Sequence, residues 1–169
     1  YVQFHPTSLY TGSTGRAFLI SESCRGEGAI LLNAKGERFV DELQPRDVVS
    51  AAVYRQMRED GLPFVRLSFE RIPRGVTCRH FRNIRERCLE EGYDICEGPI
   101  PVAPAQHYLM GGIRVDQDSR SSMEHLYAVG ETSCSGVHGK NRLASNSLLE
   151  SLVFSRLAAR DIVRRRHHA

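Results

Sequence analysis

The feature that most constrains the fold is the polar run from Gly139 to Glu150, which stands directly before a long stretch with helical apolar spacing. This spacing predicts a helix from about Ser145 to Arg164. The first N–H groups of a helix have no partner inside it, and they carry its positive end. Because the guanidinium of Arg142 precedes these groups, the segment predicts a site for an anionic or carbonyl-rich ligand.

Length and charge narrow the class of protein. A chain of 169 residues can bury a core, and no apolar run approaches the roughly 20 residues that span a bilayer, so we expect a soluble protein without a membrane partner. The net charge of +3 is small, and we interpret the basic run from Arg164 to His168 as a solvated tail, not as a nucleic-acid surface. The chain begins at Tyr1 without an initiator methionine or a leader, which favours an internal start.

Cysteine usage indicates the redox compartment. The chain has 5 cysteines, an odd number, and no pair stands in a CxxC spacing. This pattern favours reduced thiols in a cytoplasmic protein over a disulfide framework or a zinc site, and we expect no metal. The cysteines are Cys24, Cys78, Cys88, Cys96 and Cys134.

Periodicity predicts the elements of the first half of the chain. Alternation and flanking turns favour strands over Tyr1–Tyr10, Ala29–Leu32 and Val65–Phe69. Helical spacing predicts helices over Pro45–Asp60 and Arg79–Glu91, each closed by a glycine. The residues expected to face inward from these two helices are Val48, Val49, Ala52, Val53, Met57, Phe81, Ile84, Cys88 and Leu89.

The segment from Gly98 to Pro104 contains three prolines. Proline lacks the N–H that a helix or a central strand needs, so we interpret this segment as an extended connector that leads to His107. Beyond it we expect strands over Ile113–Val115 and Leu126–Val129 and then the long helix.

The pattern predicts an α+β protein of two parts. Residues 1–108 form one domain of mixed strands and helices, and residues 109–169 form a segment of strands and one long helix. The second part is too small to close a core alone, since its helix and strands leave apolar faces open. It therefore needs partners that this chain does not contain.

Motifs quoted in their order along the chain carry a family resemblance: FHPT at 4–7, SESCRGEG at 21–28, QPRDVV at 44–49, AQHYLMGGI at 105–113, YAVGE at 127–131 and HGKNRLASNSLLE at 138–150. Together they resemble the flavoprotein family of succinate dehydrogenase, fumarate reductase and L-aspartate oxidase, and the last motif is most similar to the L-aspartate oxidases. The resemblance implies that residues 1–108 are a capping domain that closes over a dicarboxylate, and that residues 109–169 are the C-terminal segment of an FAD-binding α/β domain. That domain is incomplete here, because the phosphate-binding GxGxxG turn of a dinucleotide-binding fold is absent from the sequence.

The resemblance assigns three residues to catalysis. Arg46 matches the arginine that transfers the proton, and Glu22 and Arg25 match a proton-relay pair. An arginine ordinarily stays protonated, so Arg46 needs help from its neighbours for such a role. Their i, i+3 spacing alone favours an exposed ion pair on a helix, and only the family resemblance reverses this preference.

The resemblance assigns four further residues to the substrate. His5, Thr7, His107 and Arg142 match groups that hold the substrate carboxylates, and Ser21 could add a hydroxyl donor. Two carboxylates on a small ligand require several cationic or donor groups. A lone histidine near an apolar stretch is more often structural, and only the motifs favour the binding role.

For the cofactor, the resemblance implies FAD. Glu131 matches the acidic residue that binds the FAD ribose, and Asn146, Ser147 and Leu148 match the turn that approaches the flavin ring at a helix start. The alternative for Ser147 is a helix N-cap, a position that serine favours.

The resemblance implies an FAD-dependent oxidoreductase that converts L-aspartate to iminosuccinate in quinolinate and NAD biosynthesis, with fumarate or a related dicarboxylate as another ligand. This chain would be a fragment of it that lacks turnover and FAD by itself. Two alternatives stay open: a fragment of a fumarate reductase or succinate dehydrogenase flavoprotein, and a non-catalytic dicarboxylate-binding or interaction domain.

Overall fold

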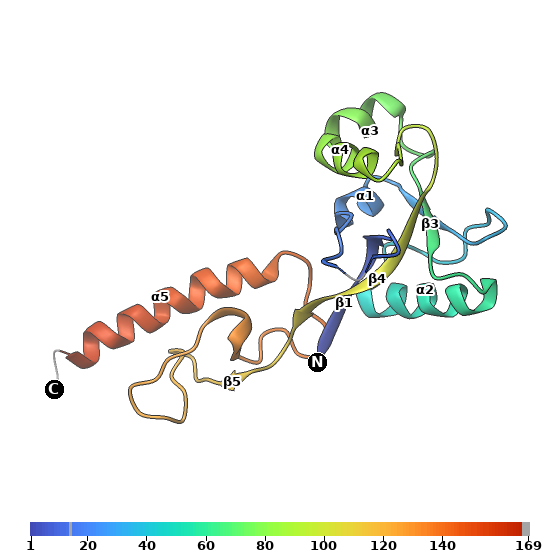
Figure 1. Cartoon of the computed structure of the whole chain (residues 1–169). Coiled ribbons are helices and arrows are strands. Elements are labelled where there is room, and N and C mark those ends of the chain that lie inside the picture. Colours follow the sequence, from blue (N-terminus) through green and yellow to red (C-terminus); the bar gives the residue numbers. More distant parts are fainter. Residues whose placement is uncertain (14, 167–169) are drawn as a thin grey trace. The chain divides into compact units, whose positions relative to one another are not determined.

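The computed structural model describes residues 1–13 and 15–166 (Figure 1). The chain divides into two compact units, of which the first is Phe4–Gln106 and the second joins Tyr1–Gln3 to the residues from His107 onward. Within the described residues, no helix is both long enough and apolar enough to cross a membrane.

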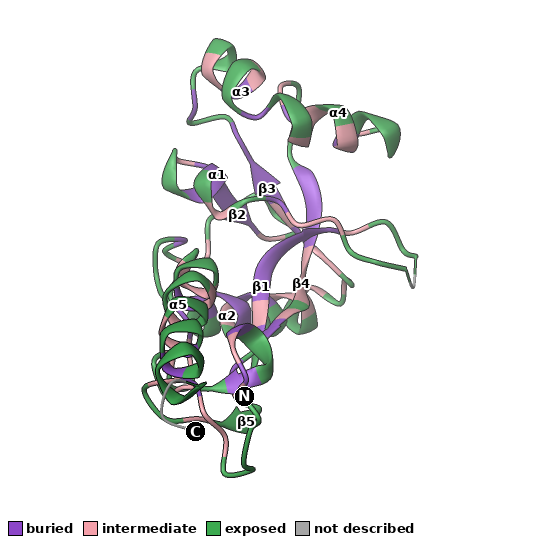
Figure 2. Cartoon of the chain, turned by 90° about the vertical axis from the view of Figure 1, so that its left-hand side faces the viewer, coloured by how far each residue is buried: buried purple, intermediate pink, exposed green. Residues whose placement is uncertain are grey.

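A four-stranded sheet carries the core of the first unit. Its order is β1-β4-β3-β2, with β1 at Val2–Leu9, β2 at Ile30–Leu32, β3 at Val65–Ser68 and β4 at Ile100–Leu109. The antiparallel register places Leu67 opposite both Leu31 and Ile100, and these three side chains are at most 1% exposed. Figure 2 shows the burial that follows along the middle of the sheet.

Four helices complete the first unit. They are α1 at Glu22–Gly26, α2 at Arg46–Asp60, α3 at Arg74–His80 and α4 at Arg82–Glu90. Gly61 ends α2 with a positive φ of 65°, a conformation that glycine adopts without strain.

The predicted inward faces of these helices are only partly correct. Val49 and Val53 of α2 are fully buried, whereas Val48 is 46% exposed. The helix predicted over Arg79–Glu91 is two helices, because the backbone leaves helical geometry at Phe81. Phe81 and Cys88 are buried as predicted, but Leu89 is 45% exposed, because the break at Phe81 changes which face of α4 meets the core.

The proline-rich segment is a central strand, which corrects the connector prediction. β4 lies between β1 and β3, and Pro101 stands opposite Arg66. Proline lacks a donor but keeps its acceptor, and the Pro101 carbonyl accepts a hydrogen bond of 3.0 Å from the N–H of Tyr10. The prolines therefore remove donors from this strand without ending it.

The second unit has a short parallel strand pair and one long helix. β5 at Ile113–Arg114 pairs with β6 at Ser133–Cys134, the 3₁₀ helix η1 covers Gly130–Thr132, and α5 covers Asn146–Arg166. The strand predicted over Leu126–Val129 is wrong, since only Tyr127 makes an isolated bridge, to Arg120.

Glycine permits the close packing of η1. Gly130 has a φ of 72°, and a Cβ there would come within 3.0 Å of the Ser151 hydroxyl on α5. Gly112 has a φ of 123°, and a Cβ there would lie 2.2 Å from the carbonyl oxygen of Thr132. Gly112 therefore requires glycine, because backbone atoms fill the space of a side chain, and Gly130 favours glycine because its positive φ is strained for other residues.

The basic run at the end of the described chain is not a tail. Arg164, Arg165 and Arg166 form the last turn of α5, while His167 and His168 lie outside the described residues. Arg164 and Arg165 donate to the carboxylate of the buried Asp161, at 2.5 and 2.9 Å. An opposite charge on the preceding turn orders this end of the helix.

The cysteine prediction is wrong for one pair. Cys78 of α3 and Cys96, in the segment before β4, form a disulfide, because folding brings their Cα atoms to 6.5 Å although 18 positions separate them. Cys24 and Cys88 are free and buried, and Cys134 is free and exposed. Burial raises the pKa of Cys24 to about 12 and that of Cys88 to about 11, so both stay protonated at neutral pH.

We predict a defined thiol count for the unreduced protein. One thiol, Cys134, should react rapidly with Ellman's reagent in buffer, and Cys24 and Cys88 should add to it only in denaturant. Cys96→Ser should expose the Cys78 thiol and lower the free energy of unfolding by about 3 kcal/mol, the usual effect of opening a loop of this length. Cys134→Ser is the control and should change stability little. Equal rates for all five thiols without reductant would contradict the disulfide.

Candidate functional site

Two helix starts bring the predicted catalytic residues together in the first unit. Arg46 is the first residue of α2, and Glu22 is the first residue of α1. The Nε and Nη2 atoms of Arg46 lie 2.8 and 2.7 Å from Oε2 of Glu22. Nη2 of Arg25, one helical turn after Glu22, lies 3.7 Å from the same oxygen. One carboxylate oxygen therefore stands between two guanidinium groups.

The two arginines of this cluster are removed from water. The side chains of Arg25 and Arg46 are 2% and 9% exposed, while that of Glu22 is 41% exposed. Burial lowers the pKa of Arg25, and its neighbour Arg46 lowers it further, although the charge of Glu22 opposes this. Burial favours the neutral form of Glu22, but the hydrogen bond and charge of Arg46 outweigh it, so the pKa of Glu22 is lowered.

This geometry suits a proton relay. Oε2 of Glu22 is hydrogen-bonded to Arg46 and lies 3.7 Å from Nη2 of Arg25, and the exposed part of Glu22 connects the cluster to solvent. Arg25 is further held through Nη1, which donates to the main-chain carbonyl of Glu42 at 2.7 Å. The cluster therefore has a fixed orientation before any ligand binds.

His5, Thr7 and Ser21 surround the entry to α1. His5 Nε2 lies 2.7 Å from the carbonyl oxygen of Ile20, and since a carbonyl only accepts, Nε2 carries the proton. The Thr7 hydroxyl donates to the same carbonyl at 3.2 Å, and the Ser21 hydroxyl accepts from the N–H of Ser23 as the N-cap of α1. His5 and Thr7 thus hold the loop that positions Glu22.

Arg142 of the second unit is buried, with 4% exposure. Its guanidinium carbon lies 4.2 Å from the centre of the Tyr108 ring, which is a cation–π contact. Gln3 donates through Nε2 to the Arg142 carbonyl at 2.6 Å and to the Asn141 side-chain oxygen at 3.0 Å. His107 precedes Tyr108 on β4 and is half-buried.

Sequence reasoning missed a polar cluster beside Arg142. It joins Tyr108, Ser135, His138 and Glu150, and Glu150 is buried at its centre. Three of these residues stand inside the quoted motifs, at positions to which no role was assigned. The signal was therefore present, but only folding shows that the side chains meet.

The expected cofactor residues also lie in the second unit. Glu131 is an exposed residue of η1, and its Oε1 accepts from the N–H of Leu109 at 2.8 Å. Asn146, Ser147 and Leu148 are the first three residues of α5, so Ser147 lies inside the helix and the N-cap alternative is wrong.

These residues fit part of an FAD molecule. A carboxylate accepts from ribose hydroxyls, and the N–H groups of the first helical turn donate to carbonyl or anionic edges of a ring. FAD also carries a pyrophosphate, for which the sequence offers no GxGxxG turn. The donor set therefore suits the ribose and the ring, and not the pyrophosphate.

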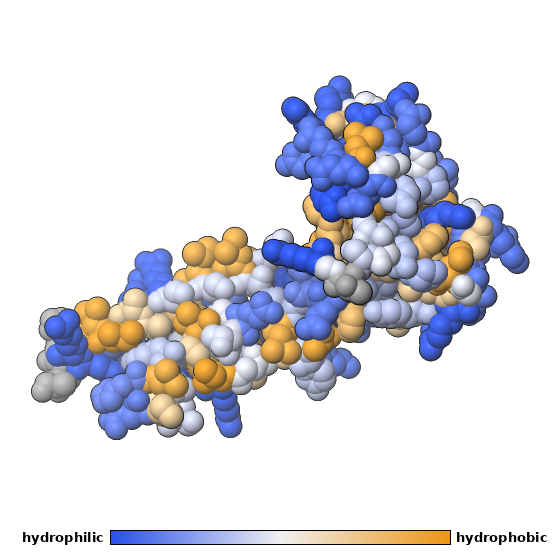
Figure 3. Space-filling model, viewed as in Figure 1, coloured by the Kyte–Doolittle hydropathy of each residue, from blue (hydrophilic) through white to orange (hydrophobic). Residues whose placement is uncertain are grey.

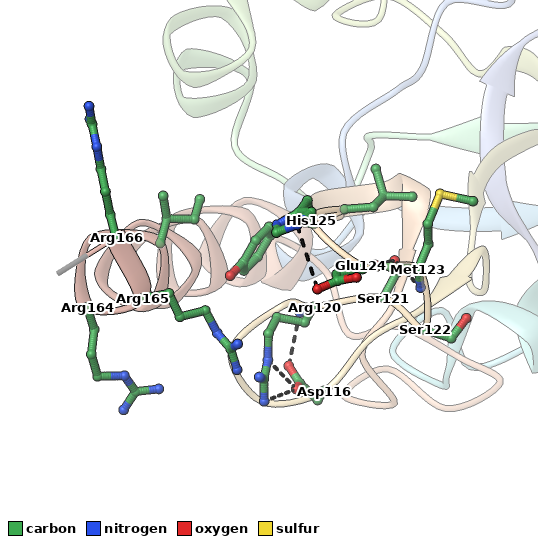
Figure 4. A pocket seen from close by; sticks show the side chains of 13 residues that line it. Asp116, Arg120, Ser121, Ser122, Met123, Glu124, His125, Arg164, Arg165 and Arg166 are labelled. Carbon is green, nitrogen blue, oxygen red and sulfur yellow. Dashed lines mark hydrogen bonds and ion pairs between the residues drawn. The ribbon is translucent and has the colours of Figure 1, made fainter. Parts of the chain in front are cut away.

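A cavity of about 900 Å³ in the second unit contains none of the predicted site residues. Figure 4 shows that the segment 116–127 and the last turn of α5 line it. Some of its charges have partners, since Arg120 binds Asp116 at 2.8 Å and Arg164 and Arg165 bind Asp161, which lies outside the lining. We assign it no ligand.

The fold and the expected cofactor residues of the second unit agree with a flavin-binding class of protein, and the family comparison shows that class. The sequence model of the family described as FAD binding domain matches residues 1–148, and the chain belongs to this family.

The chain is similar to known L-aspartate oxidases. It is 58% identical to that of Clostridium perfringens over 163 residues, which cover 96% of this chain and 37% of the relative. For the enzyme of Clostridium acetobutylicum the identity is 54%, with 96% and 38% covered. The chain thus spans little more than a third of the length of these relatives.

Solved structures of fumarate reductases contain the fold of this chain. A quinol fumarate reductase of E. coli superposes with a TM-score of 0.83 at 37% identity, covering 94% of this chain and 31% of that one. A quinol-fumarate reductase with menaquinol molecules gives 0.86 at 37% identity, covering 95% and 32%. The predicted α+β class and the predicted flavoprotein family with its FAD cofactor are confirmed.

The Glu22 cluster predicts a pH-dependent stability. Because the folded pKa of Glu22 is lowered, its contribution is present above the unfolded value near 4.5 and is lost as the pH falls through the folded pKa. Glu22→Gln should therefore destabilise the protein at pH 7 and much less at pH 3, as measured by urea unfolding.

The control for this series is Glu124→Gln, which removes a carboxylate that is 89% exposed. It should leave stability nearly unchanged at both pH values. A Glu22→Gln deficit that is the same at both pH values would show that the ion pair with Arg46 does not stabilise the fold.

Proposed function

We propose that the chain is part of an FAD-dependent L-aspartate oxidase that converts L-aspartate to iminosuccinate in quinolinate and NAD biosynthesis. The observation that carries this proposal is the Glu22 oxygen held between Arg46 and Arg25. The identity of 58% to the L-aspartate oxidase of Clostridium perfringens supports the choice of substrate. We further propose that the enzyme acts in the cytoplasm.

In this proposal the chain binds the substrate and moves protons. FAD, when bound, supplies the two-electron oxidation, and Glu131, Asn146, Ser147 and Leu148 hold it through its ribose and ring. In the second unit, His107 and Arg142 bind a carboxylate of L-aspartate, fumarate or a related dicarboxylate. In the first unit, His5 and Thr7 are the further carboxylate-binding candidates, and in this structure both bind the carbonyl of Ile20. Residues 1–108 act as the capping domain that excludes water, and residues 109–169 belong to the FAD-binding domain.

Arg46 is the proposed proton-transfer group. Arg46 gives its own proton to Glu22 Oε2, at 2.7 Å from Nη2, and takes up the proton that the substrate loses. The proton on Glu22, whose side chain is 41% exposed, then passes to solvent, and Arg25 is the second guanidinium beside Glu22. The burial that lowers the pKa of Arg25 makes this residue a better proton donor than a solvated arginine. The relay therefore includes two groups, Glu22 and Arg25, whose proton affinities folding has changed.

We also propose that the chain alone lacks turnover and holds FAD weakly. Apolar side chains of α5 face solvent, among them Leu148 at 67%, Leu152 at 64% and Val163 at 57% exposure (Figure 3). An apolar surface of this kind normally packs against protein. The missing dinucleotide-binding fold, which would supply the pyrophosphate site, is the proposed partner of this helix.

Two alternatives have a specific basis. The TM-score of 0.86 to a quinol-fumarate reductase favours a fumarate reductase or succinate dehydrogenase flavoprotein, which would purify with an iron–sulfur partner. The absence of the GxGxxG turn favours a non-catalytic dicarboxylate-binding or interaction domain, which would purify without flavin.

Spectra and assays separate these functions. The full-length protein should be yellow and should oxidise L-aspartate, whereas this chain alone should lose added FAD on gel filtration and show no turnover. Fumarate reduction without oxidation of L-aspartate would contradict the proposed substrate, and a colourless full-length protein would favour the non-catalytic alternative.

Arg46 and Arg142 should differ in their kinetics in the full-length enzyme. Arg46→Lys keeps the charge but changes the proton-transfer group, so kcat should fall about 100-fold or more while KM changes less. Arg142→Lys removes a bidentate carboxylate ligand, so KM should rise strongly. A nearly unchanged kcat with a raised KM for Arg46→Lys would move Arg46 from proton transfer to binding.

A further inference from the structure

A buried carboxylate lies at the centre of the polar cluster in the second unit. The side chain of Glu150 on α5 is 2% exposed. Its Oε2 lies 2.8 Å from Nε2 of His138 and 3.5 Å from the hydroxyl of Tyr108, and its Oε1 accepts from the hydroxyl of Ser135. An ionised carboxylate only accepts, so all three neighbours donate to it.

This arrangement fixes the direction of three side chains at once. A buried charge is costly unless donors satisfy it, and here the donors come from β4 and from the segment that precedes α5. The rings of Tyr108 and His138 also meet edge to face, with 5.9 Å between their centres. Tyr108 is thus held at its hydroxyl by Glu150 and at its ring by His138.

Tyr108 in turn supports Arg142. Its ring face lies 4.2 Å from the Arg142 guanidinium carbon, while Gln3 holds the Arg142 carbonyl. The backbone and the side chain of Arg142 therefore have separate supports. Of these two contacts, only the one between the Arg142 guanidinium and the Tyr108 ring connects Arg142 to Glu150.

We propose that Glu150 is a positioning residue, which holds the Arg142 guanidinium in its carboxylate-binding orientation through Tyr108 and His138. This inference rests on the proposed role of Arg142 in dicarboxylate binding. Glu150 does not itself touch the substrate. It affects the reaction only by orienting the guanidinium of Arg142, which is buried.

The test is a double-mutant cycle in the full-length flavoenzyme. Glu150→Gln keeps the size of the side chain but places an amide N–H₂ where three donors converge. It is combined with Arg142→Lys, and Glu124→Gln, at a carboxylate 89% exposed, is the matched control. Each variant is measured for flavin content, thermal unfolding, the Kd of a dicarboxylate from the flavin spectrum, KM and kcat.

We expect Glu150→Gln to raise the dicarboxylate Kd and KM about tenfold, the scale of one charge-assisted hydrogen bond, with kcat changed less than about threefold. In the Arg142→Lys background the same substitution should change Kd and KM less than about twofold, because the group that Glu150 positions is gone. Tyr108→Phe, which keeps the ring face, should have a smaller effect than Tyr108→Leu.

A full tenfold effect in both backgrounds would overturn the proposal, since Glu150 would then act independently of Arg142. An unchanged Kd and KM with lost flavin or lowered thermal stability would also overturn it and leave Glu150 a structural residue. The proposed function is judged separately, from the reaction of the wild-type enzyme with L-aspartate. The dicarboxylate Kd tests the positioning role even if fumarate is the true substrate.

Discussion

A buried ion must find opposite charge or hydrogen-bond donors, and this constraint organises both units. In the first unit the carboxylate of Glu22 supplies the opposite charge for the buried guanidinium groups of Arg25 and Arg46. In the second unit Glu150 gathers Tyr108, Ser135 and His138, and the carboxylate of Asp161 accepts from the hydroxyl of Tyr127 at 2.8 Å. Removal of one partner would leave a charge uncompensated, so each cluster holds its elements in one arrangement. The same requirement that stabilises the fold thereby orients the groups to which we assign chemistry.

These groups stand on regular elements, mostly at their ends. Glu22 and Arg46 begin α1 and α2, Glu131 is in η1, and Asn146 begins α5. A helix start supplies unpaired N–H groups and positive potential, and a regular element restricts the side-chain direction better than a loop does. In the proposed function, this placement holds a small dianion and a cofactor in a fixed geometry. It also explains why conservative substitutions such as arginine to lysine should have large effects.

The chain belongs to the FAD binding domain family and spans little more than a third of its L-aspartate oxidase relatives. The exposed apolar residues of α5 form a surface of the kind that normally packs against protein. In a flavoenzyme the cofactor carries the electrons, and the protein positions the reactants, supplies charge and excludes water. In the proposed function, the residues of this chain provide position, charge and the exclusion of water.

The sequence by itself determined the family, through the order of its motifs along the chain. It also determined the ends of α2 and most of the secondary structure, because helix-end residues and apolar spacing act between neighbouring residues. Only the tertiary structure decided that β4 is a central strand despite its prolines, and that Cys78 meets Cys96. It also decided that Glu22 contacts Arg46, 24 positions away, and that Glu150 contacts Tyr108, 42 positions away. Local patterns cannot specify such pairs, because the strands and helices between the two residues must pack before their side chains share a buried charge.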